Sequence, residues 1–103
     1  MTSVLVCDGS PLVREGFRRA LAGLPGLDRV LAVPTAETLV ARWTGDRPDL
    51  ALLDARLPGI GGVETVRRVV RADPSARVMM LTVPEDEETV MAAVAAGARG
   101  YLY

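Results

Sequence analysis

The sequence contains no histidine and no lysine, and its 12 basic residues are all arginines. Without histidine, the chain has no imidazole that could act as a general base or bind a metal ion. Without lysine, it also lacks the ammonium group that many phosphate sites use. These absences exclude a histidine-based active site, a metal site with histidine ligands and a phosphate-binding lysine within these residues.

Cysteine and long apolar runs are also scarce. Cys7 is the single cysteine, so these residues cannot form an internal disulfide bond. Because Cys7 lies in the apolar run VLVC with no histidine to activate it, we interpret it as a small buried side chain rather than a catalytic thiol. No apolar run approaches the ~18 residues that a membrane span requires. We expect a soluble, cytoplasmic protein with no membrane partner.

Apolar residues are plentiful and make up 50% of the 103 residues. A chain of this length buries one hydrophobic core, so we expect a single domain over residues 1–103. The 12 basic and 13 acidic residues leave a net charge of −1, and the arginines are scattered along the chain. We therefore expect no nucleic-acid contact from these residues themselves.

Short apolar runs alternate with segments in which apolar residues recur at helical spacing. Strands that alternate with helices form parallel sheets, because each helix returns the chain to the edge where the next strand starts. The sequence therefore predicts an α/β fold with five parallel strands. The runs begin near Val4, Val30, Leu50, Val78 and Tyr101.

Four helices are expected between these strands. Ser10 followed by Pro11 is typical of a helix start, and Thr35 is expected to cap a second helix that runs through about Thr44. Asp73 should end the third helix, and the fourth is expected over residues 85–96. The predicted inner residues are Val13, Phe17, Ala20, Leu21 and Leu24 for the first helix, and Val63, Val66 and Val70 for the third.

The chain stops at Tyr103, directly after the fifth apolar run. Sheets of this class have helices on both faces, so a missing fifth helix would leave apolar surface uncovered. We therefore expect either that the chain was cut here or that a partner covers this face.

Polar side chains directly follow three of the predicted strands: Asp8, Asp54 and Thr82. In an open parallel sheet the carboxyl ends of the strands meet at one edge, where ligands bind. Two carboxylates without a lysine or histidine repel each other, and a hard cation such as Mg²⁺ would relieve this repulsion. The alternative is that Asp8 and Asp54 only cap the helices that follow them.

Three segments carry a resemblance to a known family: LLDARLPGIGG (52–62), VMMLT (78–82) and AAGARGYL (95–102). In this order and spacing they resemble the receiver domains of bacterial two-component response regulators. The NarL/LuxR type looks closest, particularly the BldM-like actinobacterial kind. The resemblance covers the whole chain and implies a flavodoxin-like, doubly wound sheet with strand order 2-1-3-4-5. It also implies a regulatory domain rather than an enzyme.

The resemblance implies roles for the matching residues. Asp54 corresponds to the phosphoacceptor, Thr82 to the hydroxyl residue that binds the phosphoryl group, and Tyr101 to the aromatic switch in strand 5. Mg²⁺ would be bound by Asp8, Asp54 and the backbone carbonyl of Arg56. The Arg56 side chain either contacts the phosphoryl group or is simply exposed to solvent.

The resemblance also implies partners. These are a sensor histidine kinase, a second copy or a related regulator in a homodimer or heterodimer, and DNA only through a C-terminal helix-turn-helix domain that this chain lacks. The family's lysine would directly follow Tyr103. The fourth helix and strand 5 offer a dimer surface with Met91, Ala95, Tyr101 and Tyr103.

Gly9 departs from the family pattern, because receivers usually carry two adjacent acids where this chain has Asp8-Gly9. With one carboxylate fewer, Mg²⁺ should bind more weakly. This favours a second hypothesis, a pseudo-receiver that acts as a dimerisation or interaction module without phosphorylation. A third hypothesis, a small flavodoxin-like enzyme or nucleotide-binding protein, is disfavoured because no glycine-rich phosphate loop follows strand 1.

Overall fold

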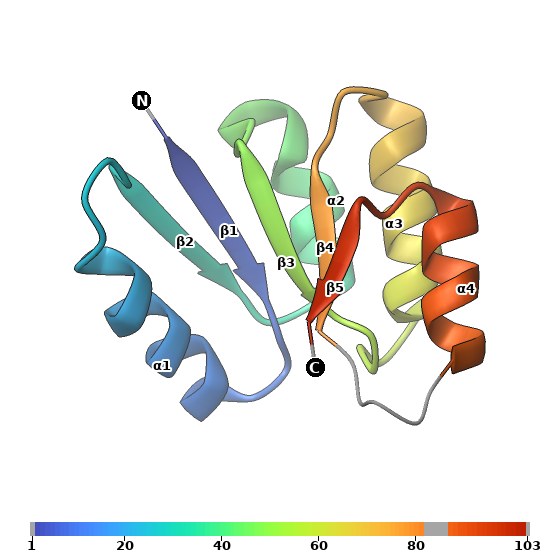
Figure 1. The fold of residues 1–103 in the computed structure, drawn as a ribbon, viewed down its shortest axis with the longest axis horizontal. Coiled ribbons are helices and arrows are strands. Elements are labelled where there is room, and N and C mark those ends of the chain that lie inside the picture. The colour runs from blue at the N-terminus through green and yellow to red at the C-terminus, as the bar shows by residue number, and fades with distance from the viewer. Residues whose placement is uncertain (1, 82–86, 103) are drawn as a thin grey trace.

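The computed structural model describes residues 2–81 and 87–102, without the side chains of residues 87, 89, 90, 101 and 102. Within these residues, strands and helices alternate along the whole chain (Figure 1). The elements are β1 (Ser3–Cys7), α1 (Pro11–Ala22), β2 (Arg29–Val33), α2 (Ala36–Asp46), β3 (Leu50–Asp54), α3 (Gly61–Ala72), β4 (Val78–Leu81), α4 (Glu87–Ala96) and β5 (Gly100–Leu102).

The described strands form one parallel sheet in the order β2-β1-β3-β4-β5. The predicted α/β fold and the predicted strand order are therefore confirmed. β1 and β3 lie next to each other at the centre, with Cys7 paired with Leu53. This pairing matters for function, because it brings the residues that follow the two strands to neighbouring positions.

One face of the sheet, here called the packed face, is covered by α2, α3 and α4 (Figure 1). Successive side chains of a strand point to opposite faces, so every second strand residue contributes to this core. Val66 of α3 is buried as predicted, while Val63 and Val70 are half-buried against the same core. The buried residues of this core are Leu5, Cys7, Val33, Ala36, Leu39, Trp43, Ala51, Leu53, Leu57, Val66, Val69, Ala76, Val78, Met80, Ala93 and Ala98.

The opposite face, here called the open face, is covered among the described residues only by α1 (Figure 1). Val4, Val6 and Leu52 form its small core, against which Phe17 and Leu21 pack. No residue of α1 is buried. The covering of this face is therefore partial.

The predicted inner stripe of the first helix is wrong at three of its five positions. Val13 is 37% exposed, Leu24 is 52% exposed and lies beyond the end of α1, and Ala20 is also exposed. Helical spacing shows that a helix has an apolar side, but burial of that side requires neighbours on both flanks. Along the described chain, α1 has no neighbouring helix on its face of the sheet, so the margins of its stripe reach solvent.

The start of the first helix agrees with the sequence, and the end of the second does not. The predicted start of the fourth helix near Glu85 lies outside the described residues. The Ser10 hydroxyl accepts a hydrogen bond from the Val13 amide, so Ser10 caps α1 as predicted. The second helix extends beyond the predicted residue 44 to Asp46. Arg47 then ends it in the left-handed conformation with φ 41°, and its amide donates to the Trp43 carbonyl. None of the helices in the described ranges is long and apolar enough to cross a membrane.

Candidate functional site

The carboxyl ends of β1 and β3 place two aspartates side by side. Cys7 pairs with Leu53; Asp8 directly follows β1, and Asp54 is the last residue of β3. Neighbouring strands lie about 4.8 Å apart, so the two carboxylates share one edge of the sheet. Asp54 in turn pairs with Leu81, the last described residue of β4. Thr82 follows Leu81 in the sequence but lies outside the described residues.

Each of the two aspartates makes one local hydrogen bond. Asp8 is 7% exposed, and its Oδ1 accepts a 2.9 Å hydrogen bond from the Ser10 amide. Asp54 is half-buried, and its Oδ1 accepts a 2.9 Å hydrogen bond from the Arg56 amide. Neither caps a helix, because Ser10 caps α1 and Ile60 precedes α3 without a side-chain cap. The alternative that these acids serve only as helix caps is therefore wrong.

The pKa of the Cys7 thiol is influenced by the charged side chains at this edge. Cys7 is fully buried, as predicted, and burial is the largest cause that raises its pKa to about 12. The negative charges of Asp8, Asp54 and Glu37 raise the pKa further, while the positive charge of Arg14 lowers it. Three carboxylates and one guanidinium thus act electrostatically on the carboxyl end of β1.

Glu37 and Arg14 were missed by the sequence analysis. Glu37 lies in the first turn of α2, and its Oε1 is 2.7 Å from the position that a Cβ at Gly59 would occupy. Gly59 has φ 77°, so the loop after β3 passes this carboxylate with a glycine in a left-handed conformation. The first turn of a helix is an ordinary place for an acid, so no local signal marks Glu37 as a site residue.

Comparison with known proteins identifies the family and the fold. Residues 4–103 match the family model described as the response regulator receiver domain. The chain belongs to the response regulator receiver family. It is 37% identical to the response regulator GacA of Pseudomonas syringae over 99% of this chain and 48% of GacA. It is 35% identical to the response regulator UvrY of Escherichia coli over 99% of this chain and 47% of UvrY.

A solved structure supports the same assignment. A two-component response regulator of the LuxR family from Aurantimonas has a TM-score of 0.90 and 32% identity, over 98% of this chain and 73% of that one. The predicted membership of the receiver family is therefore confirmed. This receiver spans about half the length of the GacA and UvrY relatives that it matches.

The remaining predicted site residues of this receiver are placed only in part. Arg56 is exposed, and its amide rather than its side chain contacts Asp54. Tyr101 belongs to β5 and pairs with Met80, but its side chain lies outside the described residues. The structure thus brings together Asp8, Asp54 and the main chain of Arg56.

Gly9 leaves room at the edge of the sheet where Asp8 and Asp54 lie, here called the acidic pocket. A Cβ at Gly9 would meet no atom within 4 Å, and Gly9 is not among the glycines with positive φ. An aspartate would therefore fit at this position without backbone strain. Glycine in place of aspartate at position 9 therefore changes the charge of the site and does not require a different backbone conformation.

The pocket can supply few ligands to a metal ion. Among the described residues, no three histidine, cysteine or acidic side chains are grouped so that they could hold a metal. Asp8 and Asp54 each have one carboxylate oxygen engaged by a loop amide, which leaves the other oxygen for a ligand. Mg²⁺ is usually bound by one or two carboxylates together with waters and phosphate oxygens. Asp8 and Asp54 therefore provide enough carboxylate ligands for Mg²⁺, with none to spare.

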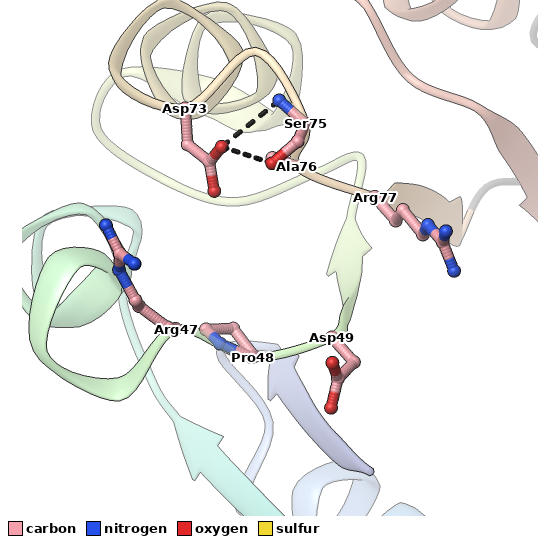
Figure 2. Close-up of a pocket in the computed structure, with 7 residues that line it drawn as sticks. All are labelled: Arg47, Pro48, Asp49, Asp73, Ser75, Ala76 and Arg77. Atoms are coloured by element: carbon pink, nitrogen blue, oxygen red, sulfur yellow. Dashed lines mark hydrogen bonds between the residues drawn. The ribbon is translucent and has the colours of Figure 1, made fainter. Parts of the chain in front are cut away.

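A pocket lies at the other end of the sheet, where β3 and β4 begin (Figure 2). It encloses about 430 Å³ and is lined partly by Asp49 and Asp73. Asp49 accepts from the Ser3 amide, and Asp73 accepts from the Trp43 indole and from the amide and hydroxyl of Ser75. Asp49 and Asp73 therefore serve as structural hydrogen-bond acceptors. Asp8 and Asp54, at the carboxyl ends of the strands, each accept only one side-chain hydrogen bond among the described residues.

Proposed function

We propose that this receiver accepts a phosphoryl group on Asp54 from a sensor histidine kinase and so controls transcription. The observation that carries this proposal is the position of Asp54 at the carboxyl end of a central strand. There, one of its oxygens is bonded to a loop amide and the buried Asp8 lies alongside. A nucleophilic carboxylate needs an accessible oxygen in a fixed orientation, and the bond from the Arg56 amide supplies the orientation.

The proposed transfer is a displacement at phosphorus. The free carboxylate oxygen of Asp54 attacks the phosphoryl group of a phosphohistidine, a P–O bond forms, and the P–N bond breaks with its electron pair returning to the imidazole nitrogen. Asp8, Asp54 and the Arg56 carbonyl would hold Mg²⁺, which when bound neutralises charge on the phosphoryl oxygens. The Arg56 amide keeps the attacking carboxylate in place during the transfer.

The signal would leave the site through residues that follow β4 and lie in β5. We assign to Thr82 the role of a hydroxyl that moves toward the new phosphoryl group, and to Tyr101 the role of an aromatic switch. The exposed Arg56 side chain lies two residues after the phosphoacceptor in the sequence and would contact the phosphoryl oxygens.

The output would involve association. On α4, Met91 is 70% exposed, Val94 is 51% exposed and Ala95 is also exposed, so this surface is apolar. Such surfaces commonly mark contacts between proteins, and we assign this one to a homodimer or to a heterodimer with a related regulator. DNA would be bound only by a separate domain outside these residues.

A pseudo-receiver is the second candidate function, and Gly9 is the observation that favours it. The pocket has one strand-end carboxylate fewer than the family pattern, so Mg²⁺ should bind weakly and phosphoryl transfer should be slow. In that case the domain would act by dimerisation without phosphorylation.

Beryllofluoride, which imitates a phosphoryl group on aspartate, separates the two functions. We expect beryllofluoride with Mg²⁺ to raise the melting temperature of the wild type and of Gly9→Asp, with a larger rise in Gly9→Asp. The rise should be absent in Asp54→Asn and unchanged in Glu88→Gln, a control with an exposed acid on α4. A rise in Gly9→Asp alone would support the pseudo-receiver. No rise in either protein would overturn the phosphoacceptor role of Asp54.

A further inference from the structure

Arg14 differs from the other arginines of this chain. In the described structure it is the only one of the 12 that is not exposed. It ends the first turn of α1, where a positive charge is unfavourable because the amino terminus of a helix already carries positive partial charge. Helix stability therefore does not explain its presence there.

The side chain of Arg14 reaches back to the candidate site. Its Nη1 donates a 2.8 Å hydrogen bond to the backbone carbonyl of Asp8, across the loop that joins β1 to α1. None of the ion pairs among the described residues involves Arg14. The guanidinium is thus anchored to the main chain at the acidic edge, and within residues 2–81 and the described side chains of 88–100 it forms no direct ion pair.

The strand pairing shows which acids lie on this side of the sheet. Arg14 is bonded to the main chain of Asp8, and Asp54 ends the neighbouring strand directly after Leu53, the partner of Cys7. Residues 9–13 contain no acid. Gly9 occupies the position at which the family pattern has a second acid, and that acid would have been the strand-end carboxylate closest to Arg14 in the sequence. The pocket therefore combines a reduced number of carboxylates with one partly buried fixed cation.

We propose that Arg14 is a positioning residue that provides a built-in positive charge to the acidic pocket and takes over part of the neutralising role of a divalent cation. The inference rests on the proposed function of the pocket. The bond to the Asp8 carbonyl keeps the charge beside Asp8, and Asp54 ends the neighbouring strand. Charges about 10 Å apart still interact appreciably at the edge of a protein, so direct contact with the ligand is not required.

This role predicts an effect of opposite sign to that of a structural brace. A fixed cation repels Mg²⁺, so Arg14→Gln should tighten Mg²⁺ binding by on the order of tenfold. A residue that only braced the Asp8 loop would, when removed, misplace the carboxylate and weaken Mg²⁺ binding. Arg14→Lys keeps the charge and should keep the wild-type affinity.

The experiment is a calorimetric titration with Mg²⁺ of the wild type, Arg14→Gln, Arg14→Lys and Arg71→Gln. Arg71 is exposed in the last turn of α3, so Arg71→Gln removes the same charge far from the pocket and should leave the affinity unchanged. The titration is repeated with Gly9→Asp and with Gly9→Asp combined with Arg14→Gln, which secures a measurable affinity. If Arg14→Gln does not fold, Arg14→Met, which keeps the apolar stem, replaces it in both series.

Tighter Mg²⁺ binding on loss of the Arg14 charge supports the inference. Weaker or equal binding in both backgrounds, or no Mg²⁺ binding by any of these proteins, overturns it. Failure of the proposed function gives a different result, because the wild type and Gly9→Asp would then not bind beryllofluoride. The role of Arg14 would still be decided by whether its substitution tightens or weakens Mg²⁺ binding.

Discussion

The packed face and the open face of the sheet are built from the same strands but covered very differently. On the packed face, α2, α3 and α4 contribute buried side chains such as Leu39, Val66 and Ala93. On the open face, α1 contributes no buried residue, and an apolar groove of about 270 Å³ runs along it past Val13 and Phe17. The difference shows that an amphipathic helix is not sufficient for a closed core, because burial also requires neighbouring elements.

Stability and function depend on different parts of the molecule. The packed face supplies most of the buried apolar surface and therefore most of the stability. The site lies where both faces meet the carboxyl edge, since Asp8 leads into α1 and Asp54 leads into α3. A change in the packing of α1 or α3 can thus shift Asp8 or Asp54, because only a short loop separates each aspartate from its helix.

The largest effect should come from truncating the core on the packed face. Leu53 is 1% exposed on the packed face, and Leu52 is 6% exposed on the open face. We expect Leu53→Ala to cost about 4–5 kcal/mol and Leu52→Ala about 2–3 kcal/mol, because a loosely covered site relaxes around a cavity more readily. Urea unfolding of both variants measures the difference. Equal costs would show that the two faces are packed equally well.

Two glycine substitutions should differ in sign. A Cβ at Gly62 in α3 would lie 2.8 Å from the Ala55 Cα and 2.9 Å from the Asp54 carbonyl oxygen, both backbone atoms. Gly62→Ala should therefore cost about 1–3 kcal/mol. A Cβ at Gly16 in α1 would meet no atom within 4 Å, so Gly16→Ala should stabilise the protein by about 1 kcal/mol through helix propensity. Thermal melting of both variants tests this, and a loss of stability in Gly16→Ala would contradict the openness of the α1 face.

The acid dependence of stability should depend on a contact within the packed face. Hydrogen bonds from the Ser75 side chain and then from the Trp43 indole lower the pKa of Asp73. Since the folded pKa lies below the unfolded value of about 3.9, this contribution is present above that pH and is lost as the pH falls toward the folded pKa. Asp73→Asn should reduce the loss of stability in acid. Fluorescence of Trp43, the single tryptophan, follows unfolding, and an unchanged acid slope in Asp73→Asn would assign the effect to other acids.

Much of the fold and part of the site could be predicted from the sequence. The strand positions and the meeting of Asp8 with Asp54 follow from local apolar runs and from the geometry common to parallel sheets. The α1 stripe was predicted wrongly because residue spacing contains no information on which neighbours cover a helix. The nearness of Glu37 and Arg14 to the pocket depends on how two helices lie against the sheet, so no spacing in the sequence could reveal it.

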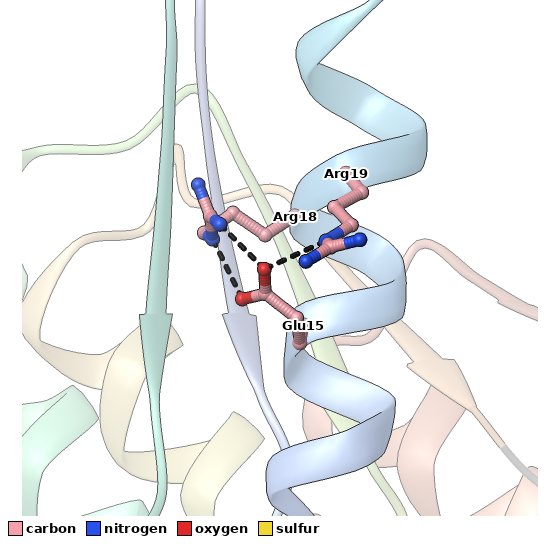
Figure 3. A network of polar contacts seen from close by, with 3 residues as sticks. All are labelled: Glu15, Arg18 and Arg19. Carbon is pink, nitrogen blue, oxygen red and sulfur yellow. Dashed lines mark hydrogen bonds and ion pairs between the residues drawn. The ribbon is translucent and has the colours of Figure 1, made fainter.

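The smallest effect concerns an identical ion-pair arrangement on the two faces. In α1, Glu15 binds Arg18 and Arg19 (Figure 3), and in α3, Glu64 binds Arg67 and Arg68 with the same spacing. Hydrogen bonds from Arg18 and then from Arg19 lower the pKa of Glu15 to about 2, so its contribution is present above the ordinary glutamate pKa and is lost only in strong acid. Both networks are exposed and local, so their loss should change global stability little.

The two networks should nevertheless differ in what they protect. Because α1 has no buried residue, its amides can exchange with solvent through local opening, whereas α3 opens only with the core. We therefore expect Glu15→Gln to speed amide hydrogen exchange in α1, and Glu64→Gln to leave exchange in α3 unchanged. The effect of Glu15→Gln should disappear at about 1 M salt, where charges are screened within about 3 Å. Equal acceleration in both helices would mean that α3 also opens locally, and that the packed face protects its helices no better than the open one.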